Sequence, residues 1–409
     1  MPPGGSKPTA KNASPPGATI HGVDWISALP DAVLQHALGF LPAREAVRTS
    51  VLAGRWRHLW RFLPHLRVTD AEALGSAKKL KAMVSQLLLL RDSGLALDEC
   101  VFNLPGFEGA DTLKVDRWIR HALLLRARVL CLSTQESIVL KDRRLVSQYL
   151  RTLHLSGVEL FYDILDFSSC PALVDLEITS SFTYTHEIRS PSSKCMSIVN
   201  CSFLGSSVRI RISAPSLIWL KLEYCDGLTP FLENMPSLET ASMRFGCENE
   251  DLCEEDCSAD CCGECFRCHD DGVRIDGCVL LGGLSNATNL NFRASFGMFT
   301  FKKDLARCPT FHKLKNLCLT DWCLAGDLHA LLGFLQHTPN LEKLNLQLCQ
   351  KEKCALETGG SNAIEQSFSL GQLKIVEIKC EKIDERVQKT LKILSKIGIC
   401  LEQFNIQKI

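Results

Sequence analysis

The chain has 409 residues, and its 46 Lys and Arg balance 46 Asp and Glu to a formal net charge of zero. This balance excludes the class of strongly basic proteins that bind nucleic acid through bulk charge, so we expect no nucleic-acid partner. No window approaches 18 uninterrupted apolar residues, so we also expect no membrane span. The length suggests two or three domains.

The 21 cysteines would indicate disulfides in a secreted chain. The first twenty residues, however, are rich in Pro, Gly, Ser, Ala and Lys and lack the apolar core of a signal peptide. We therefore expect free thiols and a location in the cytoplasm, the nucleus or both. Residues 1–22 are too polar to bury much surface, so we expect a disordered leader.

Residues 23–62 predict three short helices. Leu29-Pro30 and Leu41-Pro42 each open a helical pattern, because Pro fixes its own φ and makes the preceding residue extended. A third pattern follows over residues 52–60, and Gly39 is placed where a helix end favours a left-handed residue. Helices this short cannot enclose all of their apolar side chains. Either the rest of the chain covers them, or they bind a partner protein.

This stretch resembles the F-box of plant proteins, through both Leu-Pro pairs, the run from Arg48 to Leu52 and the run from Arg55 to Trp60. In that family the module binds the Skp-type adaptor of a cullin–RING ubiquitin ligase. Ala37 stands where the family usually has Ile, and Ala53-Gly54 where it usually has Ser-Lys, and the loss of a branched contact predicts docking weaker by about 1–3 kcal/mol. The resemblance implies that the adaptor is contacted by Leu29, Pro30, Leu34, Leu38, Leu41, Pro42, Val47, Val51, Leu52 and Trp56.

Residues 63–94 predict a helical linker. From residue 95 to residue 369 a unit of the form apolar-x-x-apolar-x-apolar recurs with a period in the twenties. Clear copies begin at Leu150, Leu173, Leu217, Leu314, Leu341, Leu373 and Leu401, and weaker ones at Leu97, Ala127, Met196, Leu238 and Ala287. The pattern resembles leucine-rich repeats, because one unit cannot bury its apolar face and must stack on its neighbours. It implies an α/β fold in which a curved solenoid follows the F-box, with parallel strands on the concave face and helices or loops on the convex face.

The x positions of these units should line the concave face, where a target protein would bind. Trp219 is the best single candidate, because an exposed aromatic on a polar surface is a common hot spot. The equal alternative is that it packs under a neighbouring loop. Cys225 and Cys349 follow their strands at the position where such repeats hydrogen-bond the turn, so we expect both to be structural. The target-binding candidates are Arg151, Thr152, His154, Asp175, Glu177, Trp219, Lys221, Asn316, Lys343, Asn345 and Glu377.

An acidic, cysteine-rich insert at 247–271 separates the repeat starts at Leu238 and Ala287. Its cysteine spacing matches that of zinc or iron–sulfur ligands, whereas the dense acidic residues favour a plain flexible loop. A redox sensor is the third possibility, and no other cofactor is expected. The candidate metal ligands are Cys257, Cys261, Cys262, Cys265, Cys268 and His269.

Residues 370–409 predict a strand, an amphipathic helix and a second strand. This segment resembles the C-terminal FBD region of plant F-box proteins, and we expect it to cap the open end of the solenoid.

The sequence contains no phosphate loop, no His-Glu-x-x-His and no nucleophile elbow, so no catalytic activity of its own is predicted. Together these features favour a non-catalytic substrate receptor of a Skp–cullin–F-box ubiquitin ligase that binds an unknown target protein. Two alternatives remain open. One is a repeat scaffold or inhibitor independent of any ligase, and the other is a small-molecule sensor.

Overall fold

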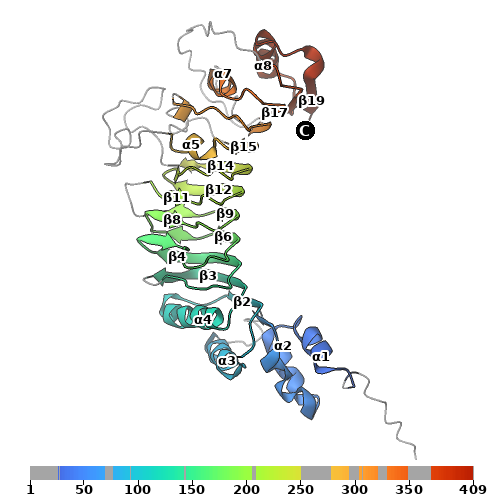
Figure 1. Cartoon of the computed structure of the whole chain (residues 1–409), viewed down its shortest axis with the longest axis vertical. Helices are drawn as coiled ribbons and strands as arrows, with labels where there is room; N and C mark the ends of the chain where they lie inside the picture. Colours follow the sequence, from blue (N-terminus) through green and yellow to red (C-terminus); the bar gives the residue numbers. More distant parts are fainter. Residues whose placement is uncertain are drawn as a thin grey trace, which may run out of the picture.

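The computed structural model describes residues 26, 28–69, 77–92, 94–141, 144–204, 209–249, 278–293, 304–305, 307–320, 329–348 and 370–408. The expected leader at 1–22 and residues 250–271 of the insert lie outside the described residues. The described part is an elongated stack of strands with a small helical module at its N-terminal end (Figure 1).

The N-terminal module contains the expected short helices. Pro30 precedes α1 (Asp31–Leu38), Pro42 precedes α2 (Ala43–Arg48), and the 3-10 helices η1 (Thr49–Val51) and η2 (Gly54–Phe62) follow. The expectation for Gly39 is wrong, because its φ of −62° is right-handed. A Cβ at Gly39 would lie 3.2 Å from both the His36 carbonyl oxygen and His65 Nδ1, so close packing favours glycine there.

The strands of the repeats form one parallel sheet in chain order. Two short strands, β7 (Phe182–Thr183) and β10 (Ser202–Phe203), pair with the later parts of β4 and β12. The sheet confirms the predicted parallel solenoid. Its strands in order are β1 (His65–Val68), β2 (Glu99–Leu104), β3 (Val129–Lys141), β4 (Thr152–Phe161), β6 (Asp175–Thr179), β9 (Cys195–Val199), β12 (Trp219–Gly227), β14 (Thr240–Asn249), β15 (Asn289–Arg293), β16 (Asn316–Thr320), β17 (Lys343–Leu348), β18 (Ile375–Cys380) and β19 (Phe404–Lys408).

The opposite side of the stack changes along its length. Its middle is a second parallel sheet of β5 (Ile164–Asp166), β8 (Glu187–Arg189), β11 (Arg211–Ser213) and β13 (Phe231–Leu232). Helices lie beside the first and last strands instead (Figure 1). These are η4 (Gly109–Asp111), α3 (Ala77–Leu90), α4 (Thr112–Leu124), α5 (Leu281–Leu284), α7 (His329–Gln336), α8 (Glu385–Lys396) and η5 (Leu401–Gln403).

Strand register corrects two of the repeat boundaries. Cys195 pairs with Trp219, so the repeat that contains β9 begins at Ser193 rather than at Met196. His65 pairs with Glu99, so Leu63 begins a further repeat inside the expected helical linker. Of that linker, only α3 at its later end is helical in the described residues. The stack therefore begins about thirty residues before the expected boundary.

Strands β14 and β15, on either side of the long interval around the insert, are direct neighbours in the main sheet. Thr240 pairs directly with Asn289, although 49 positions separate the two repeat starts. The C-terminal segment has the expected strand, helix and strand. However, β19 pairs with β18 as the last strand in the described sheet order and is mostly exposed, so the segment adds a repeat and leaves a new edge.

Burial alternates along the strands as the repeat unit predicts. In β6 and β9 the apolar positions are buried and the x positions are half-buried. One continuous apolar cluster runs from Ala43 on α2 to Ile399. We call the face of the main sheet that carries the x positions the concave face. Since every repeat shares the core with its neighbours, the stack holds this face as one rigid surface.

Candidate functional site

The N-terminal module exposes several large apolar side chains. Val51 is 87% exposed, Leu52 69% and Phe40 66%. The module lies at one end of the stack, so the described repeats do not cover this surface (Figure 1). Exposed apolar clusters usually mark an interaction site. We define the docking face as Ile26, Leu29, Val33, Phe40, Leu41, Val51 and Leu52.

A separate small core supports the docking face from inside. It consists of Leu34, Leu38, Ala46, Leu59 and Leu63, with Trp56 and Trp60 packed against it. Trp60 also packs against the core of the repeats. The module therefore folds around its own apolar centre and does not need the docking face for that purpose.

The implied adaptor contacts divide into three groups by exposure. Leu29, Pro30, Leu41, Val51 and Leu52 are exposed, and Pro42, Val47 and Trp56 are half-buried. Leu34 and Leu38 are only 1% and 3% exposed, so in this conformation they have almost no surface to offer a partner. Their contact with an adaptor stays a prediction.

Three exposed apolar residues were absent from the implied contacts, namely Ile26, Val33 and Phe40. Val33 and Phe40 are sequence neighbours of the implied contacts Leu34 and Leu41. For Val33 and Leu34, helical periodicity alone does not show which of the two faces inward, whereas Phe40 and Leu41 lie beyond α1 and are both exposed. Packing of α1 against η2 decides this by burying Leu34 and turning Val33 outward.

The module is joined to the repeats by specific contacts. Arg67 on β1 pairs with Glu99 at 2.5 Å and donates to the Gly39 carbonyl oxygen at 2.9 Å. The Asp98 N–H donates to the Pro64 carbonyl oxygen at 2.7 Å. Since β1 begins three residues after η2 ends, the docking face is held in a fixed position relative to the repeats.

The x positions lie on one face of the main sheet, as the alternation of burial requires. Arg151 and Asn316 are exposed, and the other target-binding candidates are half-buried. Trp219 is half-buried between Cys195 and Thr240 in register, so it is neither fully exposed nor packed away.

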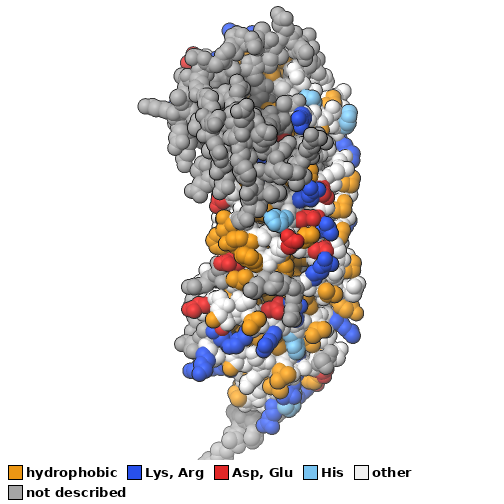
Figure 2. Space-filling view, turned by 90° about the vertical axis from the view of Figure 1, so that its left-hand side faces the viewer, with side chains coloured by type: hydrophobic (Ala, Val, Ile, Leu, Met, Phe, Trp, Pro, Cys, Tyr) orange, Lys and Arg blue, Asp and Glu red, His pale blue; other side chains and the backbone are white. Residues whose placement is uncertain are grey.

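Charged side chains on this face pair across neighbouring positions. Lys343 lies 2.7 Å from Glu377, and Lys221 lies 3.3 Å from Glu223. His154 Nδ1 lies 3.5 Å from Glu177, so this pair is ionic only when the imidazole is protonated. The side of the molecule shown in Figure 2, which is the left-hand side of Figure 1, carries Lys and Arg interspersed with Asp and Glu. Paired charges leave the described concave face close to neutral.

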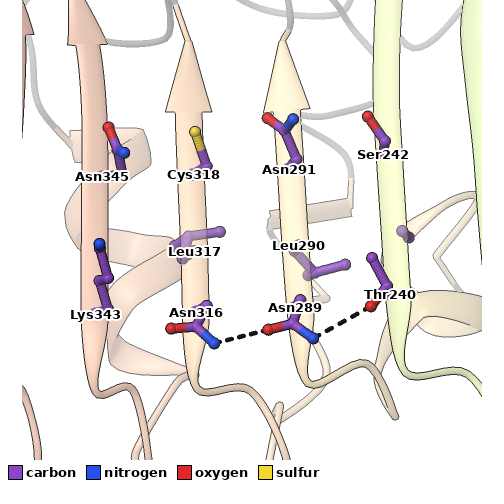
Figure 3. Close-up of a pocket in the computed structure, with 11 residues that line it drawn as sticks. Thr240, Ser242, Asn289, Leu290, Asn291, Asn316, Leu317, Cys318, Lys343 and Asn345 are labelled. Carbon is purple, nitrogen blue, oxygen red and sulfur yellow. Dashed lines mark hydrogen bonds between the residues drawn. The ribbon is translucent and has the colours of Figure 1, made fainter.

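A shallow pocket of about 430 Å³ opens on the concave side of β14 to β17 (Figure 3). Its lining is mainly uncharged and rich in amides. The predicted candidates Asn316, Lys343 and Asn345 lie in it. The remaining lining residues are Thr240, Ala241, Ser242, Asn289, Leu290, Asn291, Leu317 and Cys318.

Asn289 and Asn291 are pocket residues that were not among the predicted candidates. Both occupy x positions of the repeat that begins at Ala287, which follows the insert and matches the repeat unit weakly. The same x-position rule that selected Asn316 would have found them, had that repeat been given equal weight.

Cys225 near the end of β12 and Cys201 just after β9 are structural. Cys225 Sγ contacts the carbonyl oxygens of Ile198 and Glu223 at 3.6 and 3.5 Å, and Cys201 makes the equivalent contacts one repeat earlier. Burial raises the pKa of Cys225 to about 12 and that of Cys201 to about 11. Neither thiol ionises near neutral pH, so neither is a reactive nucleophile. Cys349 lies outside the described residues.

The candidate metal ligands between Cys257 and His269 also lie outside the described residues. In the part of the chain that the structure describes, no three His, Cys, Asp or Glu side chains are grouped as metal ligands. None of the described helices combines the length and the apolar character that crossing a membrane requires.

Comparison with known families identifies the N-terminal module. The F-box domain model matches residues 26–67. An F-box/LRR-repeat protein of Arabidopsis thaliana is 32% identical over 239 residues, which cover 56% of this chain and 57% of that protein. An FBD-associated F-box protein of Arabidopsis thaliana is 24% identical over 84% of this chain and 78% of its own length. The MEIOTIC F-BOX protein MOF of Oryza sativa subsp. japonica is 28% identical over 87% of this chain and 80% of its own length. No solved structure shows a significant match.

The docking face thus belongs to an F-box domain, and the polar face to a solenoid of stacked parallel repeats. The chain is a homologue of the plant F-box/LRR-repeat and FBD-associated F-box proteins.

Proposed function

We propose that this protein is the substrate-recognition subunit of a Skp–cullin–F-box E3 ubiquitin ligase. In this proposal the docking face binds a Skp-type adaptor, and through it a cullin–RING ligase, while the concave face binds a target protein. The observation that carries the proposal is the exposure of Val51, Leu52 and Phe40 on a module that already has its own buried core.

The mechanism is geometric. The junction around Arg67 and Glu99 fixes the docking face relative to the concave face, so a bound target stays at a set distance from the ligase. Tethering replaces a bimolecular encounter with an intramolecular one and raises the effective concentration of the target lysine. The chain would act without a catalytic group or cofactor of its own, in the cytoplasm or the nucleus.

The test is capture of a purified plant Skp-type adaptor by the full chain. Val51→Asp combined with Leu52→Asp removes two exposed apolar contacts, each worth about 1.5–3 kcal/mol when buried, and adds two charges to desolvate. We expect adaptor affinity to fall by roughly a hundredfold or more, because every 1.4 kcal/mol is a factor of ten. The melting temperature should change little, since both side chains are exposed.

The matched control is Leu113→Asp combined with Leu124→Asp. These side chains on α4 are 70% and 81% exposed, comparable to Leu52 and Val51, but they lie on the repeats. The control should bind adaptor normally. Undiminished capture by the Val51 and Leu52 variant would instead favour a scaffold that works independently of a ligase.

A further inference from the structure

The pocket on β14 to β17 contains a continuous row of hydrogen-bonding side chains. Asn316 Nδ2 donates to Asn289 Oδ1 at 2.7 Å, and Asn289 Nδ2 donates to Thr240 Oγ1 at 3.2 Å. Figure 3 shows these three side chains in line across neighbouring strands. Each internal bond uses one donor of an amide that has two, so the row keeps donors and acceptors for a ligand.

Asn345 lies two residues further along its strand than the row of Asn289 and Asn316, and it has a buried hydrogen-bond acceptor without a partner. Its Nδ2 donates to Glu377 Oε2 at 3.2 Å, but its Oδ1 has no hydrogen-bond partner among the described residues and almost no solvent contact. A buried acceptor without a partner costs roughly 1–3 kcal/mol. A rotation of the Asn345 amide into the pocket would bring this oxygen within reach of a ligand N–H and recover that cost.

The charges at the pocket exclude a strongly charged ligand. Lys343 is its charged lining residue, and Glu377 lies 2.7 Å from the Lys343 ammonium. Because Glu377 also accepts from Asn345, one carboxylate balances the lysine and orients the amide. The pocket therefore offers hydrogen bonds with little net charge.

A carboxamide carries the same groups as a peptide bond, an N–H donor and a C=O acceptor in one plane. A row of amides can consequently satisfy the N–H and C=O groups of an extended main chain, whatever its side chains are. The row is also elongated, since adjacent strands lie about 4.8 Å apart. It continues through Thr240 to Trp219, which is the register partner of Thr240 on β12. A long occupant fits this shape better than a compact one.

We propose that the pocket on β14 to β17 binds an uncharged, extended peptide segment of the target. Asn289, Asn316 and Asn345 hydrogen-bond its main chain, and an apolar side chain of the peptide lies on Trp219. This inference deepens the proposed function and rests on it, because it names the kind of target segment that the receptor recognises.

The probe is a random dodecapeptide library displayed on phage and selected on the full chain. Enriched peptides are synthesised and their affinities measured by fluorescence polarisation. We expect Asn316→Ala to weaken binding roughly tenfold and Trp219→Ala at least as much. Single N-methylation of the peptide backbone should also cost about tenfold at the two or three residues that contact the amides.

Asn286→Ala is the matched control. The Asn286 amide donates to Asn234 Oδ1 at 3.3 Å outside the pocket, so its loss removes a similar amide pair. This variant should bind peptide as the wild type does. The inference is overturned if no peptide is enriched, if Asn316→Ala leaves the peptide affinity unchanged, or if no backbone N-methyl group lowers that affinity.

Adaptor capture is measured on the same preparations to separate the two proposals. Normal adaptor capture without peptide binding overturns the peptide inference alone. Peptide binding that depends on Asn316, in a chain that captures no adaptor, overturns the ligase proposal and retains the peptide site.

Discussion

The F-box module and the solenoid use apolar surface in opposite ways. The module buries five residues in its own core and exposes seven large apolar side chains between Ile26 and Leu52. The solenoid buries its leucines in one continuous cluster and presents a polar, nearly neutral concave face. A surface that is apolar throughout suits one constant partner, because its affinity comes from burial, whereas a polar face with placed hydrogen bonds discriminates between partners.

One core substitution in each region tests whether the module and the solenoid unfold independently of each other. Leu222→Ala in the solenoid and Leu34→Ala in the module each remove a side chain that is 1% exposed, and each should cost about 2–5 kcal/mol. We expect Leu34→Ala to abolish adaptor capture while the β-sheet circular dichroism and its melting transition persist. Leu222→Ala should lower that melting transition. A single shared transition that shifts equally in both variants would show that the regions fold as one unit.

Buried and exposed carboxylates sharpen the same comparison. In the solenoid, buried Asp304 accepts backbone N–H bonds from Val279, Leu280 and Leu281 at 2.6, 2.7 and 2.8 Å. In the module, Asp31 forms an exposed pair with Arg55 at 2.6 Å. We expect Asp304→Asn to cost about 1–3 kcal/mol in urea unfolding, because the NH2 group of Asn cannot accept the backbone N–H bonds that one carboxylate oxygen accepts. The matched control Asp31→Asn should cost about 0–1 kcal/mol, as exposed ion pairs do.

The contribution of Asp304 to folding stability should change with pH in a definite direction. Burial raises the pKa of this carboxyl despite its three N–H donors, so the folded state holds the proton more tightly than the unfolded state. This contribution to stability is present below the unfolded pKa and is lost as pH rises through the folded one. The difference in unfolding free energy between wild type and Asp304→Asn should therefore increase as the pH is lowered from 7 to 4. A difference that decreases as the pH is lowered would contradict a raised pKa for Asp304.

The smallest expected effect concerns the departure from the F-box pattern at Ala37. This residue is exposed on α1 beside the docking face. Ala37→Ile adds apolar area at a position where the resemblance implies an adaptor contact, so adaptor binding should strengthen by about 1 kcal/mol, or roughly fivefold. Ala32→Ile, also exposed on α1 but turned away around the helix, should leave the affinity unchanged. An equal gain in adaptor affinity from both substitutions would indicate non-specific hydrophobic binding.

The repeat strands were predictable because each copy obeys the same local rule. Alternating leucines need a neighbour to cover them, and this alone predicts parallel strands beginning near Leu150, Leu173 and Leu217. The repeat at Leu63 was missed because Leu80 and Val84 in the following segment are spaced as in a helix. The boundary at Met196 was wrong because Ser193 occupies a position that is normally apolar. In both cases the pairing partner decided the register, and pairing is not a local property.

The amino-acid sequence by itself determined the short helices of the module, the parallel stack and the polar character of the x positions, since each follows from local spacing of apolar residues, while the F-box identity came from the resemblance of its motifs to that family. Tertiary packing decided which side chains of the module face outward, burying Leu34 and exposing Val33. It also decided that strands far apart in sequence, such as β14 and β15, are neighbours that place Thr240, Asn289 and Asn316 in one row. Such a row depends on contacts between repeats, and no single repeat contains it.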